Sequence, residues 1–218
     1  MKGGVALALA LMRELAERPE LYGELAILLV NDEEWRTAPF GHAERFADFD
    51  ACLCFEAGER TAAGEEALIV KRKAAGTLRV DAEGRSAHSG SAPERGRSAL
   101  LALAAAAQAV AACSDPAGPD RLTAVPTILR SGEAFNVVPA SGELLCDLRA
   151  DRLEAFEPVF AAVPAEHDDV RLTAALVRSW PGMDARAATA PVIEAASAAL
   201  GRPLVASERG GASDASHM

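Results

Sequence analysis

Aromatic residues are scarce in this chain: they make up 5% of its 218 residues, whereas half of the residues are apolar. A hydrophobic core must therefore be built from alanine, valine and leucine, and the length suffices for one large or two modest domains. No apolar run reaches the roughly 20 residues that a bilayer-spanning helix needs. The sequence therefore predicts no membrane segment.

Basic residues are outnumbered: 22 lysines and arginines face 32 aspartates and glutamates, which gives a formal net charge of −10. Nucleic acids and anionic membranes are bound by basic surfaces. We therefore expect neither as a partner.

Cysteine is also sparse. The four cysteines, Cys52, Cys54, Cys113 and Cys146, show neither CxxC spacing nor the density of a disulfide scaffold. They are interpreted as small buried hydrophobic residues in a reducing compartment, which favours a cytoplasmic location. The apolar stretch after Lys2 continues into a charged amphipathic segment without a cleavage site, so we expect a buried helix over 4–18 and no signal peptide.

Carboxylates follow two short apolar runs. Residues 25–30 lead directly into the sequence NDEE at 31–34, and residues 51–55 lead into Glu56. Runs of this length predict strands buried on both faces. Catalytic groups collect at the carboxyl ends of such strands in open α/β sheets, although an acidic turn alone is typical of a solvated loop.

The middle of the chain has a different pattern of apolar and polar residues. Apolar and polar residues alternate around Leu78 and Val80, as in a sheet with one wet face. The elements that follow are expected as a helix over 98–113, strands over 122–129 and 143–149, a helix over 153–163 and a strand over 170–177. This βαββαβ order is that of the ferredoxin-like fold, and its outer strands could pair with a second copy. A helix over 191–200, a strand over 204–206 and a glycine-rich loop complete the chain.

Six motifs in order resemble one enzyme family. They are MKGG at 1–4, NDEE at 31–34, FEAG at 55–58, GRSAHSGSAPERGRSAL at 84–100, GEAFNVVPASGELLCDLR at 132–149 and GGASDA at 210–215. Together they resemble the zinc-dependent amidohydrolases that include glutamate carboxypeptidase, acetylornithine deacetylase, succinyl-diaminopimelate desuccinylase and aminoacylase, with the glutamate-carboxypeptidase-like branch most similar.

The resemblance implies an α/β fold in which a lid is inserted into a catalytic domain. Residues 1–70 and 181–218 would form two parts of an incomplete zinc-exopeptidase-like catalytic domain. Residues 71–180 would form the α+β ferredoxin-like lid, which is also the dimerisation domain. The chain would then form a homodimer through this lid.

The resemblance also implies the roles of the carboxylates. In such enzymes two zinc ions share an Asp and a water molecule, and cobalt or manganese are conceivable replacements. Glu33 would be the general base, Glu34 would bind one zinc ion and Glu56 the other. A water molecule between two cations loses its proton easily, and Glu33 would pass that proton to the leaving amine.

Five further residues match positions with roles in the family. His88 resembles the residue that reaches into the partner's site and stabilises the oxyanion. Asn136 and Arg149 would hold the substrate carboxylate, for which the planar fork of Arg is suited. Gly210 and Gly211 would bring backbone NH groups close to the substrate. Without the resemblance, His88 would be interpreted as a turn histidine and Arg149 as a surface charge. Gly210 and Gly211 would be interpreted as an ordinary turn.

Three of the five metal ligands of the family have no match in these 218 residues: a His in a His-x-Asp motif, a bridging Asp and a closing His. Two carboxylates do not make a competent zinc site. We therefore expect a fragment, cut at both ends, of a hydrolase acting on N-acyl amino acids or dipeptide-like amides with a free carboxylate. The chain alone would bind zinc weakly or not at all and be inactive. The alternative is a non-catalytic dimerising or carboxylate-binding module.

Overall fold

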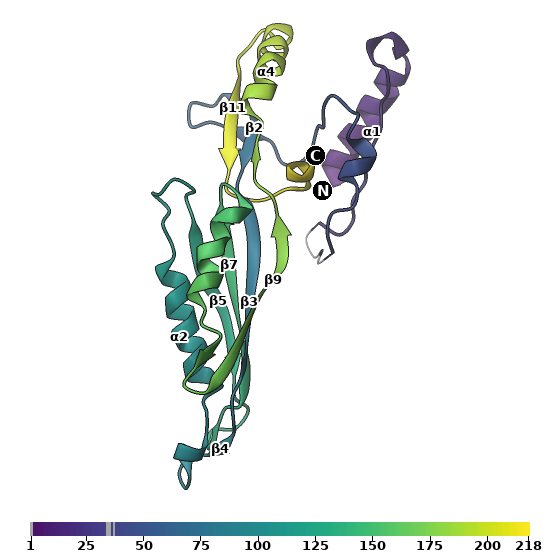
Figure 1. Ribbon diagram of the computed structural model, residues 1–218. Helices are drawn as coiled ribbons and strands as arrows, with labels where there is room; N and C mark the ends of the chain where they lie inside the picture. Colours follow the sequence, from purple (N-terminus) through teal and green to yellow (C-terminus); the bar gives the residue numbers. More distant parts are fainter. Residues whose placement is uncertain (1, 34–35, 37) are drawn as a thin grey trace. The chain divides into compact units, whose positions relative to one another are not determined.

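A computed structural model describes residues 2–33, 36 and 38–218 (Figure 1). The chain divides into two compact units. The first comprises the residues up to Arg72, Met183–Arg209 and Ser213–Met218, and the second comprises Lys73–Gly182 with Gly210–Ala212. The catalytic and lid domains expected over 1–70, 71–180 and 181–218 stay a prediction.

The second unit is built on one antiparallel sheet with the strand order β5-β7-β3-β9-β8. Its strands are β3 (Ala74–Glu83), β5 (Thr123–Ser131), β7 (Ser141–Ala150), β8 (Glu166–His167) and β9 (Val170–Trp180). Helix α2 (Ala99–Ala112) lies between β3 and β5 in the chain, and α3 (Glu157–Ala162) lies between β7 and β9. This is the βαββαβ arrangement expected from the sequence, and the mixed α/β fold class is confirmed.

The core of this unit lies between the sheet and its helices. Alternate residues of the central strands, such as Leu78, Val80, Leu144 and Leu148, are fully buried. Their neighbours along each strand point to the polar face, because successive side chains of a strand alternate. Small residues of α2 face the sheet and let the helix approach closely, and α2 runs along the sheet in Figure 1. Ser98 begins α2 by accepting a hydrogen bond from the backbone NH of Leu101.

A two-stranded ribbon extends from this unit beyond β3. Strand β4 (Ala87–His88) pairs antiparallel with β6 (Val137–Val138). His88 is opposite Val137 in this ribbon, and the label β4 marks it in Figure 1. The ribbon brings the segment after β3 next to the segment before β7.

The sheet of the first unit is centred on β2 (Glu66–Arg72). Strands β1 (Glu59–Arg60) and β10 (Met183–Asp184) pair with it antiparallel, and β11 (Leu204–Arg209) pairs with it parallel. Helix α4 (Arg186–Leu200) packs against β11 and β2 and ends at Gly201, whose φ of 64° suits glycine. The helix expected over 191–200 thus begins earlier, and the strand expected over 204–206 extends to Arg209.

Two predicted strands are wrong. Residues 25–30 and 51–55 form neither strand nor helix in the structure. Leu29 is 60% exposed and Leu53 is 63% exposed, so neither run is buried on both faces. An apolar run indicates a preference for burial, but a strand also needs backbone hydrogen bonds to a neighbouring strand. No strand among the described residues pairs with these two segments.

Helix α1 (Lys2–Ala16) forms as predicted, but it is not the buried core helix that we expected. None of its described residues is buried, and Leu7 is 64% exposed. The helix contacts residue 55, because a Cβ atom at Gly4 would lie 2.2 Å from the carbonyl oxygen of Phe55. No helix among the described residues is long and apolar enough to cross a membrane.

The interpretation of the cysteines as buried is correct only in part. Cys146 is buried in the core and Cys113 is partly buried, whereas Cys52 and Cys54 are exposed. The two exposed cysteines lie in the segment that was wrongly predicted to be a buried strand, so both errors have the same origin.

Candidate functional site

Residues 31–33 of the acidic motif lie in a turn of the first unit. Glu33 is partly buried there, and Glu34 lies outside the described residues. Asp32 accepts a hydrogen bond of 2.7 Å from Nη2 of Arg36. This bond lowers the pKa of the Asp32 carboxyl, so Asp32 is an anion at neutral pH.

Arg36 connects this turn to the end of the chain. Its Nη1 donates to Oδ1 of Asp214 at 2.6 Å and its Nη2 donates to Oδ2 at 2.7 Å. The residue is only 8% exposed, and its pKa is raised mainly by the hydrogen bond to Asp214. A two-pronged Arg–carboxylate pair fixes both position and orientation, so the turn and the GGASDA segment are held together.

Aromatic contacts support the same junction. The Arg36 guanidinium lies 4.9 Å from the centre of the Phe40 ring, and the His217 ring stacks on Phe40 at 4.7 Å. His42 meets the edge of Phe40 at 5.1 Å. Burial lowers the pKa of His217. The last helical turn, Asp214–His217, is therefore attached through both of its ends.

Glu56 is held by two partners. Nη2 of Arg72 donates to Oε2 at 2.6 Å, and the Ser213 hydroxyl donates to Oε1. Arg72 is 6% exposed and Ser213 is fully buried. The Sγ atom of Cys54 lies 3.7 Å from Oε1. Although the residue as a whole is exposed, the protein atoms around the sulfur remove part of its hydration, which raises the pKa of this thiol.

These contacts converge on two consecutive residues, Ser213 and Asp214. Six residues take part in these contacts: Asp32, Arg36, Glu56, Arg72, Ser213 and Asp214. The sequence motifs contain the three carboxylates of this set, but sequence reasoning missed both arginines, Arg36 and Arg72. Asp32 and Arg36 are four residues apart, and this spacing could have indicated an ion pair from the sequence alone. Nothing in the sequence indicated that Glu56 is the partner of Arg72.

The described residues do not fit a dinuclear zinc site. No group of three or more His, Cys, Asp or Glu side chains in the described part of the chain is arranged to hold a metal ion. Both oxygens of Glu56 already accept hydrogen bonds, one of them from a cation. A zinc ion needs about four ligands in close geometry, which this arrangement does not supply.

His88 and Asn136 come together in the second unit. The backbone NH of Ser89 donates to the carbonyl oxygen of Asn136 at 3.0 Å, and both predicted residues are exposed. Nδ1 of His88 accepts hydrogen bonds from the NH groups of Gly90, at 3.1 Å, and Ser91, at 3.2 Å. The proton of the neutral ring is therefore on Nε2, which remains a donor.

Arg149 is not brought to His88 and Asn136. It lies on β7 opposite Ala75 of β3, whereas the ribbon follows the other end of β3. The span from Ala75 to Glu83 is about 26 Å at the usual rise of a strand. The guanidinium of Arg149 is paired with Asp147, with an Nη2–Oδ1 distance of 2.9 Å.

The predicted glycines lie in open surroundings. A Cβ atom at Gly210 or at Gly211 would meet no heavy atom within 4 Å, and both residues are exposed. Neither has a positive φ. Their predicted contact with a substrate therefore stays a prediction.

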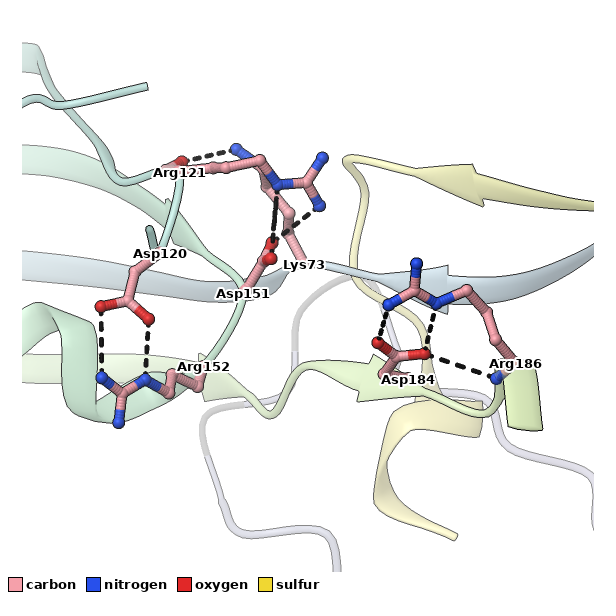
Figure 2. A network of polar contacts seen from close by, with 7 residues as sticks. All are labelled: Lys73, Asp120, Arg121, Asp151, Arg152, Asp184 and Arg186. Carbon is pink, nitrogen blue, oxygen red and sulfur yellow. Dashed lines mark hydrogen bonds and ion pairs between the residues drawn. The ribbon is translucent and has the colours of Figure 1, made fainter. Parts of the chain in front are cut away.

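A separate polar network of the second unit was not predicted (Figure 2). Lys73 donates to the carbonyl oxygen of Arg121 at 2.7 Å, the Arg121 guanidinium binds Asp151, and Arg152 binds Asp120. It joins the start of β3 to the loop before β5 and to the end of β7. A cavity of about 500 Å³ borders Asp120 and Arg152. In the first unit, Asp184 and Arg186 form a further pair in the same figure.

The chain resembles known proteins in sequence and in fold. Residues 70–170 match the M20 peptidase dimerisation domain. Carboxypeptidase G2 from Pseudomonas sp. (strain RS-16) is 29% identical over 184 residues, which are 81% of this chain and 42% of that protein. The chain thus spans about two fifths of the length of this relative.

Solved structures show the same fold. The aminopeptidase PepT from Bacillus cereus is 21% identical, with a TM-score of 0.60, and the match covers 69% of this chain and 42% of that one. An aminobenzoyl-glutamate utilization protein from Klebsiella pneumoniae is 23% identical, with a TM-score of 0.57, over 72% of this chain and 43% of that one. The resemblance to zinc-dependent amidohydrolases and peptidases that the sequence motifs indicated is confirmed by the match to the M20 peptidase dimerisation domain and to the carboxypeptidase.

Proposed function

We propose that this chain is part of an amidohydrolase that cleaves N-acyl amino acids or dipeptide-like amides with a free carboxylate. The observation that carries the proposal is the convergence of two motif segments on the GGASDA segment. Ser213 binds Glu56, and Asp214 binds Arg36, which also binds Asp32 next to Glu33. The carboxypeptidase relative supports an amide bond next to a carboxylate as the substrate.

Glu33 is the proposed general base. It follows Asp32, whose side chain is fixed by Arg36, so the backbone that carries Glu33 is held in one place. In this role the Glu33 carboxylate takes a proton from the attacking water and gives it to the leaving amine. Glu34 and Glu56 are the proposed metal ligands of the complete enzyme, and zinc is the metal that the family resemblance implies.

His88, Asn136 and Arg149 are proposed to bind the substrate. The Nε2–H of His88 suits an oxyanion, and its exposure on the ribbon suits a site on a second protomer. Asn136 lies beside it. Arg149 would exchange Asp147 for the substrate carboxylate, since both are carboxylate partners of the same guanidinium. The dimerisation domain supports a homodimer.

The described residues lack a zinc-binding arrangement, so we propose that these 218 residues alone neither hold zinc tightly nor hydrolyse the substrate. A non-catalytic module is the alternative. Its proposed carboxylate site on Asn136 and Arg149 is not supported within one chain, because the two residues lie at opposite ends of the sheet.

The test is expression of the coding sequence extended on both sides, assayed with an N-acyl amino acid and a dipeptide. We expect zinc-dependent hydrolysis that the substitution Glu33→Gln abolishes, with Glu24→Gln as the matched control. An extended protein that binds the substrate without hydrolysing it would support the module and contradict the enzyme.

A further inference from the structure

A second cavity of the second unit, of about 650 Å³, is bordered by the face of the sheet opposite α2 and by strand β6 of the ribbon. The segment that joins β6 to β7 also borders it. Its volume is within the range of about 300–1,000 Å³ that is usual for small-molecule sites. The charged residues that border it are Arg79, Asp81, Arg130, Glu133 and Glu143.

Two of the three carboxylates at this cavity are already paired. Glu143 of β7 lies directly opposite Asp81 of β3, and like charges that face each other across a sheet repel. Arg79 offsets this repulsion, because its Nη2 lies 2.7 Å from Oδ1 of Asp81 and its Nε lies 3.7 Å from Oε2 of Glu143. On the other side, Nη1 of Arg130 donates to Oε1 of Glu143 at 2.6 Å. The Glu143 carboxylate is therefore held between two guanidinium groups.

Arg130 keeps unused donors. A guanidinium has five N–H groups, and Nη1 is the one atom of this group that has a partner in the part of the chain that the structure describes. The Arg130 side chain is 63% exposed, so the remaining N–H groups are accessible to a ligand. The planar fork of an arginine suits a carboxylate in particular.

Glu133 supplies the opposite charge at the same cavity. It is exposed, and among the described residues its carboxylate has no hydrogen bond or ion pair. It follows Gly132, whose φ of 87° turns the chain, and a Cβ atom at Gly132 would lie 3.2 Å from the Pro139 side chain. The Ser131 hydroxyl donates to the carbonyl oxygen of Ser141 at 2.8 Å. These contacts hold the loop of Glu133 against the start of β7.

We propose that this cavity binds a small zwitterion, a free amino acid or a short peptide, with its carboxylate on Arg130 and its ammonium group on Glu133. A simple anion is repelled by Glu133 and a simple cation by Arg130, whereas a zwitterion offers each side chain its counter-charge. Both side chains are exposed, so the electrostatic gain is small, and the Kd is on the order of 1 mM. Neither residue belongs to the set proposed for hydrolysis, so the proposal does not rest on that function.

The test uses the 218-residue chain with isotope labelling, and the dipeptide alanylalanine as the probe. Binding is measured from the shifts of backbone amide signals in NMR spectra. N-acetylalanylalanine lacks the ammonium group and alanylalanine amide lacks the carboxylate, so these two blocked probes test each charge on the wild-type protein. Free alanine is the fourth probe, and it distinguishes an amino acid from a peptide as the ligand.

Arg130→Gln and Glu133→Gln test the two side chains. The matched control for the first is Arg152→Gln, because Arg152 is 62% exposed and also pairs with a carboxylate of the second unit. The control for the second is Glu94→Gln, because the Glu94 side chain is 71% exposed. All four positions are exposed, so we expect the circular dichroism of the variants to match that of the wild type.

We expect alanylalanine to shift the amide signals of Gly132 and Glu133 in the wild type. Each blocked probe and each cavity variant should bind about fivefold more weakly, because one charge-assisted hydrogen bond is lost, and the two control variants should bind like the wild type. Alanine that binds as tightly as the dipeptide would identify an amino-acid site, and weaker binding would identify a peptide site.

Three results would overturn the proposal. They are no shift of these amide signals at a probe concentration of about 10 mM, equal affinity for the blocked and unblocked dipeptides, or wild-type affinity in both cavity variants. Alanine released from the dipeptide would give its own signals in the same samples. Hydrolysis is therefore measured separately from binding, and either result can fail without the other.

Discussion

Arg36 and Asp214 are 178 positions apart in the chain, and they form a two-pronged ion pair with N–O distances of 2.6 and 2.7 Å. Each side chain is mostly buried, with 7% of Arg36 and 14% of Asp214 exposed. The pair therefore closes the first unit by joining its beginning to its end. It also holds the segment of Glu33, the proposed general base, against the segment of Ser213, which contacts Glu56.

Replacing Asp214 tests this closure. Asp214→Ala removes the partner of both prongs and leaves the Arg36 guanidinium with less counter-charge in a buried place. The expected loss is about 1–3 kcal/mol of unfolding free energy, seen as a lower Tm in calorimetry. Glu94→Ala is the matched control, because the Glu94 side chain is 71% exposed. Equal Tm values for the two variants would contradict the role of the pair.

Acid should weaken the same junction. The pKa of His217 in the folded chain lies below its ordinary value of 6.5, so the unfolded state binds the proton more tightly. The stabilisation is complete above pH 6.5 and is lost as the pH falls through the folded-state pKa. Asp214, Arg36 and His42 are the charged or titratable groups around the Phe40–His217 stack.

The measurement is Tm as a function of pH for the wild type and His217→Gln. We expect the wild type to lose stability between pH 7 and pH 5 and the variant to lose less over that range. At more acidic pH, below the unfolded-state pKa of Asp32, both should lose the further stability that comes from the lowered pKa of Asp32. Parallel curves from pH 7 to pH 5 would show that His217 is not responsible.

The tautomer of His88 is a third prediction. Because Nδ1 accepts two backbone hydrogen bonds, the neutral ring should carry its proton on Nε2. Long-range nitrogen–proton NMR spectra at pH 8 distinguish the two tautomers directly. His167, which lies beside Asp168, is the internal reference. A ring protonated on Nδ1 would remove the basis for the proposed oxyanion contact.

Packing against Gly76 gives a fourth prediction. A Cβ atom there would lie 2.9 Å from side-chain atoms of both Phe156 and Leu176. Gly76→Ala should therefore destabilise the second unit by about 1–3 kcal/mol through overpacking, and the additional change Phe156→Leu should recover part of the loss. Gly58→Ala, where a Cβ meets no atom within 4 Å, is the control in denaturant unfolding.

Dimerisation gives a fifth prediction. Strand β5 is an edge of the main sheet, and Val125, Ile128 and Leu129 on it are 39–49% exposed. An exposed apolar edge is suited to pairing with a second copy. We expect the wild type to sediment as a dimer and Ile128→Lys to sediment as a monomer with unchanged circular dichroism. Val192→Lys, on α4, should remain dimeric, and a dimeric Ile128→Lys would exclude this edge.

The sequence predicted the second unit well because its elements depend on neighbours in the chain. The alternation around Leu78 and Val80 follows directly from a sheet with one buried face. The alanine-rich stretch before Cys113 predicts a helix that can lie close to that sheet. These local patterns and the element order are enough to define a ferredoxin-like arrangement.

The first unit was predicted less well because it depends on distant partners. The run over 25–30 is apolar enough for a buried strand, but no local pattern says which strand would pair with it. Arg36 and Arg72 look like ordinary surface charges until their carboxylate partners, one of them far along the chain, are known. Long-range ion pairs of this kind have no periodicity that a sequence can reveal.

The strand order of the first unit has a consequence for how the protein is made. Strand β2 needs β10 and β11, and the ribosome completes Lys73–Gly182, nearly all of the second unit, before either of them emerges. The second unit is nearly continuous in the chain and can mature during synthesis, since domains generally fold as units. Until β10 and β11 have emerged, β2 has only the short β1 beside it, so a nascent chain stalled in this interval would carry an open sheet edge and attract chaperones.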